Sequence, residues 1–210
     1  IWLASLGTEQ SFRSQHGLES NRPILALVPG SRIGEIRNNL PVMAEVARRH
    51  PEMLPVVADA PAVDREIYRR YCDFDIVDND TFALMAHASG ALVTSGTATL
   101  EAALTGVPQV VCYRANGSRI SYNIFKHILK IPFVSLPNLI AGKAIVAEQL
   151  VHLCNPDLVD AELTKVLPGG TRHETQQQDY RELRKILTTA DAAANAAGII
   201  YTETQACSKA

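Results

Sequence analysis

Residues suited to metal binding or disulfide formation are sparse in this chain of 210 residues. Its four cysteines, at positions 72, 112, 154 and 207, lie at least 40 residues apart and form no CxxC pair. This spacing excludes a zinc ribbon and a dense disulfide framework, and it is typical of thiols in a reducing compartment. The six histidines show no metal-ligand spacing, and no Ser-His-Asp or Cys-His arrangement is readable. The sequence therefore predicts no metal site.

An excess of charge of one sign and a long apolar run are also lacking. The chain has 20 Lys and Arg against 22 Asp and Glu, whereas a nucleic-acid-binding protein normally shows a basic excess. No window reaches about 18 consecutive apolar residues, as a membrane span would, and no basic-then-apolar leader is present. Aromatic residues make up only 6%, but a hydrophobic share of 47% is enough for a real core. We expect a soluble, cytoplasmic, globular protein without a nucleic-acid partner.

Apolar runs alternate with helical patterns in the first half of the chain. The runs predict strands at Ile24–Val28, Leu54–Ala58, Phe74–Val77, Ala91–Thr94 and Gln109–Tyr113. The patterns between them predict helices at Ile36–His50, Val63–Tyr71, Thr81–His87 and Thr97–Leu104. Strands that alternate with helices pair in parallel through right-handed crossovers. We therefore expect an α/β fold with a Rossmann-like, doubly wound sheet, which binds ligands beyond the carboxyl ends of its strands.

The pattern changes after Tyr113. We expect an extended loop at Phe133–Asn138, a closing helix within Asp191–Gly198, and helices at Arg119–Lys130, Ala144–Leu153, Pro156–Val166 and Glu174–Thr188. Residues 1–22 are polar apart from an apolar tip, and we interpret them as a linker or an orphan N-terminal segment. The division that follows is a Rossmann-like domain at 23–190 and a closing helix or tail at 191–210.

The first strand leads into a glycine turn, Pro29-Gly30-Ser31-Arg32. Such a turn lets the backbone approach a ligand, and the N-terminus of the following helix offers N–H groups to an anion. Ser31 adds a hydroxyl, and Arg32 adds a planar fork that suits two phosphate oxygens. The stretch is neither a Walker A motif nor a clean GxGxxG. The alternative is an ordinary glycine turn with a solvated arginine.

A second turn of this kind, Thr94-Ser95-Gly96-Thr97, joins the fourth predicted strand to a helix. Ser95 and Thr97 can cap that helix, and Gly96 leaves room for a phosphate. Glu101 lies one turn further along the face of Thr97, where its carboxylate can accept hydrogen bonds from a ribose diol. Phosphate together with ribose indicates a nucleotide. The alternative is a glutamate that only complements the helix dipole.

A third stretch, Ser135-Leu136-Pro137-Asn138-Leu139-Ile140-Ala141-Gly142, places Asn138 before or within a turn. Its amide can bind a base or a sugar, or close an Asx-turn on its own backbone.

Taken together and in this order, the three stretches resemble the carboxyl-terminal domain of the lipid-A-disaccharide synthase family. The matching blocks begin at Val28, Ser95 and Val134, continue through Tyr113-Arg114 after the second block, and cover roughly Leu25 to Leu150. The resemblance implies a glycosyltransferase built from two Rossmann domains (GT-B type) that needs no metal or cofactor. Its reaction joins UDP-2,3-diacylglucosamine to 2,3-diacylglucosamine 1-phosphate, which yields UDP and the disaccharide precursor of lipid A.

The resemblance also assigns residues. It places Arg32, Glu101 and Asn138 in the donor site, with Arg32 stabilising the leaving group. Gly30, Ser31, Ser95, Gly96 and Thr97 form a phosphate cradle. The family's amino-terminal domain, with its catalytic Asp and acceptor contacts, has no counterpart downstream of Ile1, so we expect a donor-binding half that is inactive alone. Around Glu148, Ala147 and Val151 replace the family's usual Pro and Gln.

Acylated substrates imply a protein peripheral to the inner membrane of a Gram-negative cell. The stretch 119–133 has isoleucines at helical spacing beside Arg119, Lys126 and Lys130, as an interfacial helix would. The same spacing also describes a helix packed on the sheet. Two other functions stay open: another UDP-N-acetylglucosamine-type transferase or 2-epimerase of the same fold, and a non-catalytic nucleotide-binding module.

Overall fold

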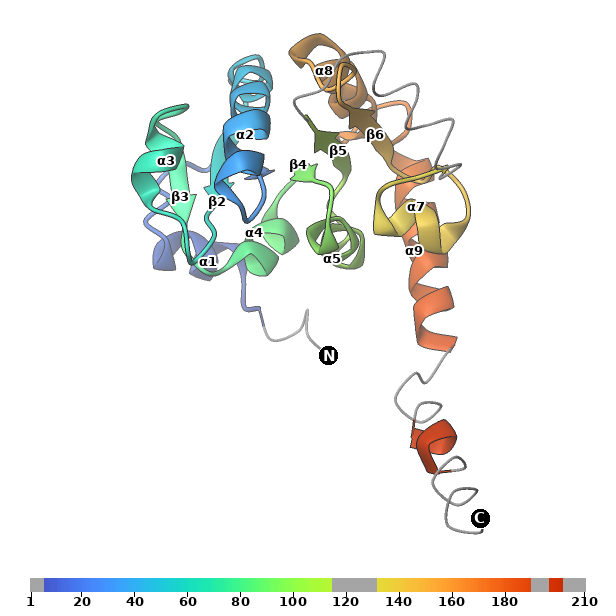
Figure 1. The fold of residues 1–210 in the computed structure, drawn as a ribbon. Helices are drawn as coiled ribbons and strands as arrows, with labels where there is room; N and C mark the ends of the chain where they lie inside the picture. Colours follow the sequence, from blue (N-terminus) through green and yellow to red (C-terminus); the bar gives the residue numbers. More distant parts are fainter. Residues whose placement is uncertain (1–5, 115–131, 190–196, 202–210) are drawn as a thin grey trace.

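The computed structural model describes residues 6–114, 132–189 and 197–201. Its centre is a six-stranded parallel sheet in the order β3-β2-β1-β4-β5-β6 (Figure 1). The strands are β1 (Ile24–Val28), β2 (Leu54–Ala58), β3 (Asp75–Val77), β4 (Gly90–Thr94), β5 (Gln109–Tyr113) and β6 (Ala147–Leu150). This topology confirms the predicted doubly wound fold, whose strand order reverses between β1 and β4.

Helices cover both faces of this sheet. They are α1 (Glu9–Gln15), α2 (Ile33–Arg48), α3 (Arg65–Arg69), α4 (Thr81–His87), α5 (Thr97–Thr105), α7 (Leu136–Ala141), α8 (Pro156–Val166) and α9 (His173–Thr189). Figure 1 shows α2, α3 and α8 on one side of the sheet and α1, α4 and α5 on the other. Because helices cover both faces, the side chains of the central strands β1 and β4 are buried on both faces.

The central strand β1 shows this division residue by residue, since none of its five side chains is exposed. Leu25 and Leu27 pack with α2 and α8, whereas Ile24 and Ala26 pack with α1 and α4. A smaller third cluster joins β5 to α9 through Val111 and the fully buried Tyr180. Helices therefore pack against both faces of the sheet.

The segment 6–22 does not run as a free linker in the part that the structure describes. Thr8 caps α1 by accepting a hydrogen bond from the backbone N–H of Ser11 at 3.2 Å. Phe12 is only 3% exposed and its ring lies 5.3 Å from that of His87 in α4. This apolar contact attaches α1 to the domain that we predicted to begin at residue 23.

Two predicted elements after Tyr113 are wrong. The predicted loop at Phe133–Asn138 ends in helix α7, which begins at Leu136 with a proline in its first turn and closes at Gly142 with φ +65°. The stretch Ala144–Leu153, which we predicted to be a helix, instead contains strand β6, and this strand pairs in parallel with β5. Sheet pairing here overrides a helix propensity that amounts to only tenths of a kcal/mol per residue.

Two further predictions lie outside the described residues: the helix Arg119–Lys130, and most of the closing helix Asp191–Gly198. Within the segments that are described, no helix combines the length and apolarity needed to cross a membrane.

Candidate functional site

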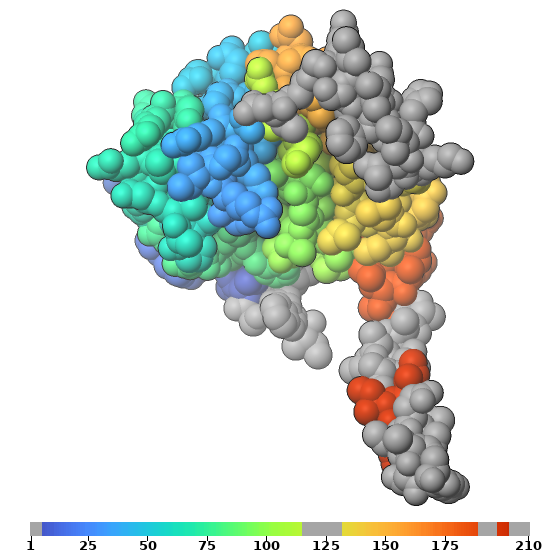
Figure 2. Space-filling view, viewed as in Figure 1, coloured from blue at the N-terminus to red at the C-terminus, as the bar shows by residue number. Residues whose placement is uncertain are grey.

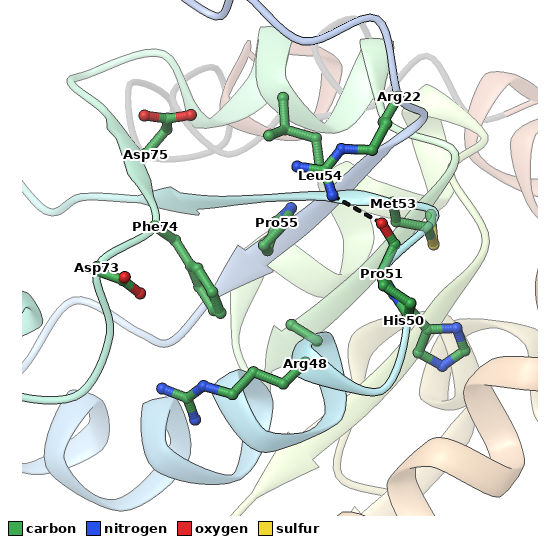
Figure 3. Close-up of a pocket in the computed structure, with 11 residues that line it drawn as sticks. Arg22, Arg48, His50, Pro51, Met53, Leu54, Pro55, Asp73, Phe74 and Asp75 are labelled. Atoms are coloured by element: carbon green, nitrogen blue, oxygen red, sulfur yellow. Dashed lines mark hydrogen bonds between the residues drawn. The ribbon is translucent and has the colours of Figure 1, made fainter.

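A cavity of about 390 Å³ opens at the carboxyl ends of β1, β2 and β4. A second cavity, of about 330 Å³, lies at the amino ends of β1, β2 and β3 (Figure 3). In the second cavity, Arg22 already donates to the carbonyl of Pro51 at 2.7 Å, and the guanidinium of Arg48 lies over the Phe74 ring. Doubly wound sheets bind their ligands at the carboxyl edge, beside the switch in strand order. The first cavity is therefore the candidate site.

This cavity gathers all the predicted donor-site residues except Asn138. Its walls include Gly30, Ser31 and Arg32 from the β1–α2 turn, and Ser95, Gly96, Thr97 and Glu101 from the β4–α5 turn and α5. Figure 2 shows the face on which α2, the β4–α5 region and α7 lie side by side. The two turns meet because parallel strands deliver their carboxyl ends to one edge of the sheet.

The β1–α2 turn is arranged around Glu35, a residue that the sequence analysis did not select. Its carboxylate accepts hydrogen bonds from the backbone N–H of Ser31 at 3.0 Å and of Arg32 at 3.3 Å, and from the guanidinium of Arg32 at 3.1 Å. These two backbone amides of the turn are therefore already paired and are not free to bind a phosphate. The signal was present in the sequence, because a glutamate at the third position of a helix commonly bonds back to the residue that precedes the helix.

Gly30 makes this arrangement possible. Its φ is +110°, and a Cβ at this position would lie 2.5 Å from Oε2 of Glu35. Only glycine combines that backbone conformation with such a close approach. Arg32 follows with a side chain that is 82% exposed, so its guanidinium can reach a ligand at the mouth of the cavity.

The β4–α5 turn leaves the N-terminus of α5 without a side-chain cap. The N-cap position is Gly96, so the predicted capping by Ser95 and Thr97 is wrong. The hydroxyl of Ser95 donates instead to the carbonyl of Val134 at 3.2 Å. A Cβ on Gly96 would meet no described atom within 4 Å, which leaves space above the helix end. An uncapped helix N-terminus beside open space favours an anion.

Two polar groups of the β4–α5 region face the cavity without a partner among the described residues. Glu101 lies in α5, one turn after Thr97, and its carboxylate forms no hydrogen bond or ion pair there. Thr94 ends β4 and is 4% exposed, and its hydroxyl has no hydrogen-bond partner within the same residues. The carboxylate of Glu101 is therefore available to a ligand's hydroxyl or amide, whereas the hydroxyl of Thr94 is buried.

Asp59 is a further lining residue that the sequence analysis missed. It follows β2 directly, and its carboxylate accepts from the backbone N–H of Asn79 at 3.1 Å. Burial and a hydrogen bond shared with Asp78 raise the pKa of Asp59 above its usual value, whereas the guanidinium of Arg65 lowers the pKa of Asp78. An acidic residue at the end of a strand beside the switch point was the available sequence signal.

Asn138 does not line the cavity, and the structure contradicts a direct contact with a ligand. It is 1% exposed, and its Oδ1 accepts from the backbone N–H of Ile145 at 2.7 Å and of Val146 at 2.9 Å. Its Nδ2 donates to the carbonyl of Val146 at 3.0 Å and to Glu148 at 2.8 Å. An amide side chain has two donors and two acceptor positions. All four are in use, so Asn138 holds α7 against the loop that leads into β6.

Across the described residues, no group of three or more His, Cys, Asp or Glu side chains could hold a metal ion. The lining of the cavity contains three acidic residues, Glu35, Asp59 and Glu101, and one basic residue, Arg32. Among the described lining of the cavity, the N-terminus of α5 is therefore the main place where a negatively charged group of a ligand can bind.

The solved structures with this fold include sugar-transferring enzymes of the GT-B class. One is sucrose-phosphate synthase from Thermosynechococcus elongatus, with a TM-score of 0.57, 15% identity, and coverage of 94% of this chain and 49% of that one. Another is the calicheamicin glycosyltransferase CalG4, with a TM-score of 0.52, 12% identity, and coverage of 87% and 43%. The fold is that of one half of a GT-B glycosyltransferase.

Sequence comparison is more specific. The family model described as lipid-A-disaccharide synthetase matches residues 4–200. The chain is 39% identical over 204 residues to the lipid-A-disaccharide synthase of Myxococcus xanthus (strain DK1622), covering 93% of this chain and 53% of that protein. It is 38% identical over 191 residues to that of Anaeromyxobacter dehalogenans (strain 2CP-C), covering 86% and 49%. The chain therefore belongs to the lipid-A-disaccharide synthase family, and it spans about half the length of these curated relatives.

Proposed function

We propose that this chain is the donor-binding half of a lipid-A-disaccharide synthase, with residues 23–190 as the donor-binding domain. The whole protein would join UDP-2,3-diacylglucosamine to 2,3-diacylglucosamine 1-phosphate and release UDP. The observation that carries the proposal is the cavity at the switch point of the sheet, in a chain of this family. It combines an uncapped helix N-terminus with a carboxylate, one turn further on, that has no partner among the described residues.

Each part of a nucleoside diphosphate then has a position in the cavity. The diphosphate lies at the N-terminus of α5, where the helix dipole and free N–H groups favour negative charge. The ribose hydroxyls donate to Glu101, one turn along the same helix. Glu35 would repel a diphosphate, because its carboxylate already fills the β1–α2 turn. The phosphates therefore belong to the α5 side of the cavity.

The reaction needs charge stabilisation on the leaving group. The acceptor's 6-hydroxyl oxygen attacks the anomeric carbon of the donor, the bond from that carbon to the diphosphate breaks, and UDP carries away the electron pair. We assign Arg32 to the developing charge, because its guanidinium reaches the mouth of the cavity and is held at one side only by Glu35. The acceptor's proton passes to a base that we place in the other half of the protein.

The acylated substrates place the whole protein at the cytoplasmic face of the inner membrane, as a peripheral protein. The stretch 119–133 remains our proposal for the contact with anionic lipid.

Calorimetry tests the donor assignment directly. This chain should bind UDP and discriminate against ADP. The α5 N-terminus and Glu101 would accept either ribose diphosphate, so the discrimination depends on contacts to the base. The full-length protein should then convert the two acylated substrates to the disaccharide, identified by mass spectrometry. Equal affinity for UDP and ADP, or a different product, would refute the proposed function.

A further inference from the structure

Glu148 in strand β6 is the centre of a hydrogen-bond network beside the candidate site. Its carboxylate accepts from the backbone N–H of Ser135 at 2.9 Å, the hydroxyl of Ser135 at 2.6 Å and the side-chain amide of Asn138 at 2.8 Å. Both of its oxygens also lie within hydrogen-bond distance of the backbone N–H of Val134, at 3.2 and 3.1 Å. One side chain therefore ties an edge strand to the segment that leads into α7.

This arrangement replaces an ordinary helix cap. Ser135 occupies the N-cap position of α7 but forms no capping hydrogen bond within that helix, because its hydroxyl points to Glu148. A carboxylate that accepts N–H groups at a helix N-terminus also complements the helix dipole. Hydrogen bonds to a charged acceptor are roughly twice as strong as neutral ones. The position of Val134 and Ser135 is therefore set by Glu148 more than by α7 itself.

Val134 connects this network to the cavity. Its N–H is donated to Glu148, and its carbonyl accepts the hydroxyl of Ser95, which lines the cavity. The proton of Ser95 is thereby directed away from the cavity. The hydroxyl oxygen retains its lone pairs, so toward a ligand Ser95 can act as an acceptor for a hydroxyl or amide group.

We propose that Glu148 is a positioning residue of the donor site: by fixing Val134 it holds the Ser95–Thr97 turn in place and keeps Ser95 as a hydrogen-bond acceptor toward the ligand. For the part that concerns the ligand, this inference rests on the proposed function. The positioning role differs from a merely structural one. In a merely structural role, Glu148 would stabilise α7 and would not affect the Ser95–Thr97 turn.

The test compares Glu148→Gln with the wild-type chain by hydrogen–deuterium exchange. Glutamine keeps the size of the side chain, but its NH₂ group replaces one acceptor and faces the N–H donors of Val134 and Ser135. Exchange should rise about threefold or more at residues 133–139 and also at residues 94–98. A rise confined to residues 133–139 would overturn the positioning role. Glu162→Gln, whose carboxylate pairs with Lys165 on α8, is the matched control and should leave both segments unchanged.

Calorimetry with UDP adds a double-mutant cycle. Glu148→Gln should weaken UDP binding about five- to tenfold, and the double variant Ser95→Ala/Glu148→Gln should be weaker than Glu148→Gln by no more than about twofold. Fully multiplicative losses would overturn the inference, because the two residues would then act independently. If the wild-type chain fails to bind UDP, the proposed function fails, whereas the exchange experiment still decides the positioning role. Should Glu148→Gln not fold, Ser135→Ala removes one of the donors and should give the same exchange pattern at smaller amplitude.

Discussion

Three carboxylates line the candidate site, and they differ in the groups that already hold them. Glu35 accepts hydrogen bonds from the backbone of Ser31 and Arg32, and Asp59 accepts from Asn79 and shares a hydrogen bond with Asp78. Glu101 has no such partner within the described residues. A ligand hydroxyl therefore meets the least competition at Glu101.

Removal of that carboxylate should affect binding and not the fold. We expect Glu101→Ala to weaken UDP binding by about 2–4 kcal/mol, because two hydrogen bonds from the ribose to a charged acceptor are lost. Calorimetry measures the affinity, and circular dichroism should show an unchanged fold. Glu45→Ala, at the far end of α2, is the matched control and should bind UDP like the wild type. Unchanged affinity in Glu101→Ala would remove this residue from the site.

Gly30 is under a different constraint, which acts on stability. Gly30→Ala should lower the free energy of unfolding by about 1–3 kcal/mol, because φ is +110° and the new Cβ would press on Glu35. The double variant Gly30→Ala/Glu35→Ala removes the contact with the carboxylate, at 2.5 Å, but keeps the contact with Cβ of residue 35, at 2.7 Å, and the unfavourable φ. In urea unfolding, the cost of the alanine at position 30 should therefore be smaller in the Glu35→Ala background. An equal cost in both backgrounds would show that the contact with the Glu35 carboxylate is not the cause.

At the scale of elements, prediction from the sequence worked where elements bury continuous apolar surface. Strands such as Ile24–Val28 and helices such as Pro156–Val166 have the predicted bounds, because their patterns are set by the faces that they bury. Strand β6 escaped prediction because its four half-buried residues, Ala-Glu-Gln-Leu, carry no strand pattern of their own. Its structure depends on pairing with β5 and on the contacts of Glu148, and neither is visible in a local window.

A buried amide contributes to the attachment of α9 to the sheet, beside the apolar cluster of Val111 and Tyr180. Gln176 accepts from the backbone N–H of Gln109 at 3.1 Å and donates to its carbonyl at 3.1 Å, so a side chain satisfies both backbone groups at the start of β5. Gln176→Leu should therefore cost about 2–4 kcal/mol of unfolding free energy, because two buried polar groups lose their partner. Urea denaturation measures this cost. Gln178→Leu, on the exposed side of the same helix, should change stability by less than about 0.5 kcal/mol, and equal losses in both variants would contradict the proposed role of Gln176.

At the scale of the whole molecule, the sequence predicted which turns meet but not how their polar groups are used. The β1–α2 and β4–α5 turns were expected together because parallel strands end at one edge, and the structure brings them together. The pairing of Glu35 with two backbone amides and the burial of Asn138 depend on distances between side chains. A sequence motif does not contain those distances. The motifs therefore predicted the location of the site correctly, but they did not predict the hydrogen-bond partners of each residue.

The whole molecule also sets a limit on catalysis by this chain. We expect the 210 residues to bind UDP and to form no disaccharide, because catalysis requires donor and acceptor to be held together, and our proposal places the acceptor and the base in the other half. Mass spectrometry of a reaction with both acylated substrates measures the product, with the full-length protein as the positive control. Disaccharide formed by the chain alone would refute this division of labour. Asp59, the cavity carboxyl whose pKa is raised, would then be the first candidate for the base, and Asp59→Asn should abolish that activity.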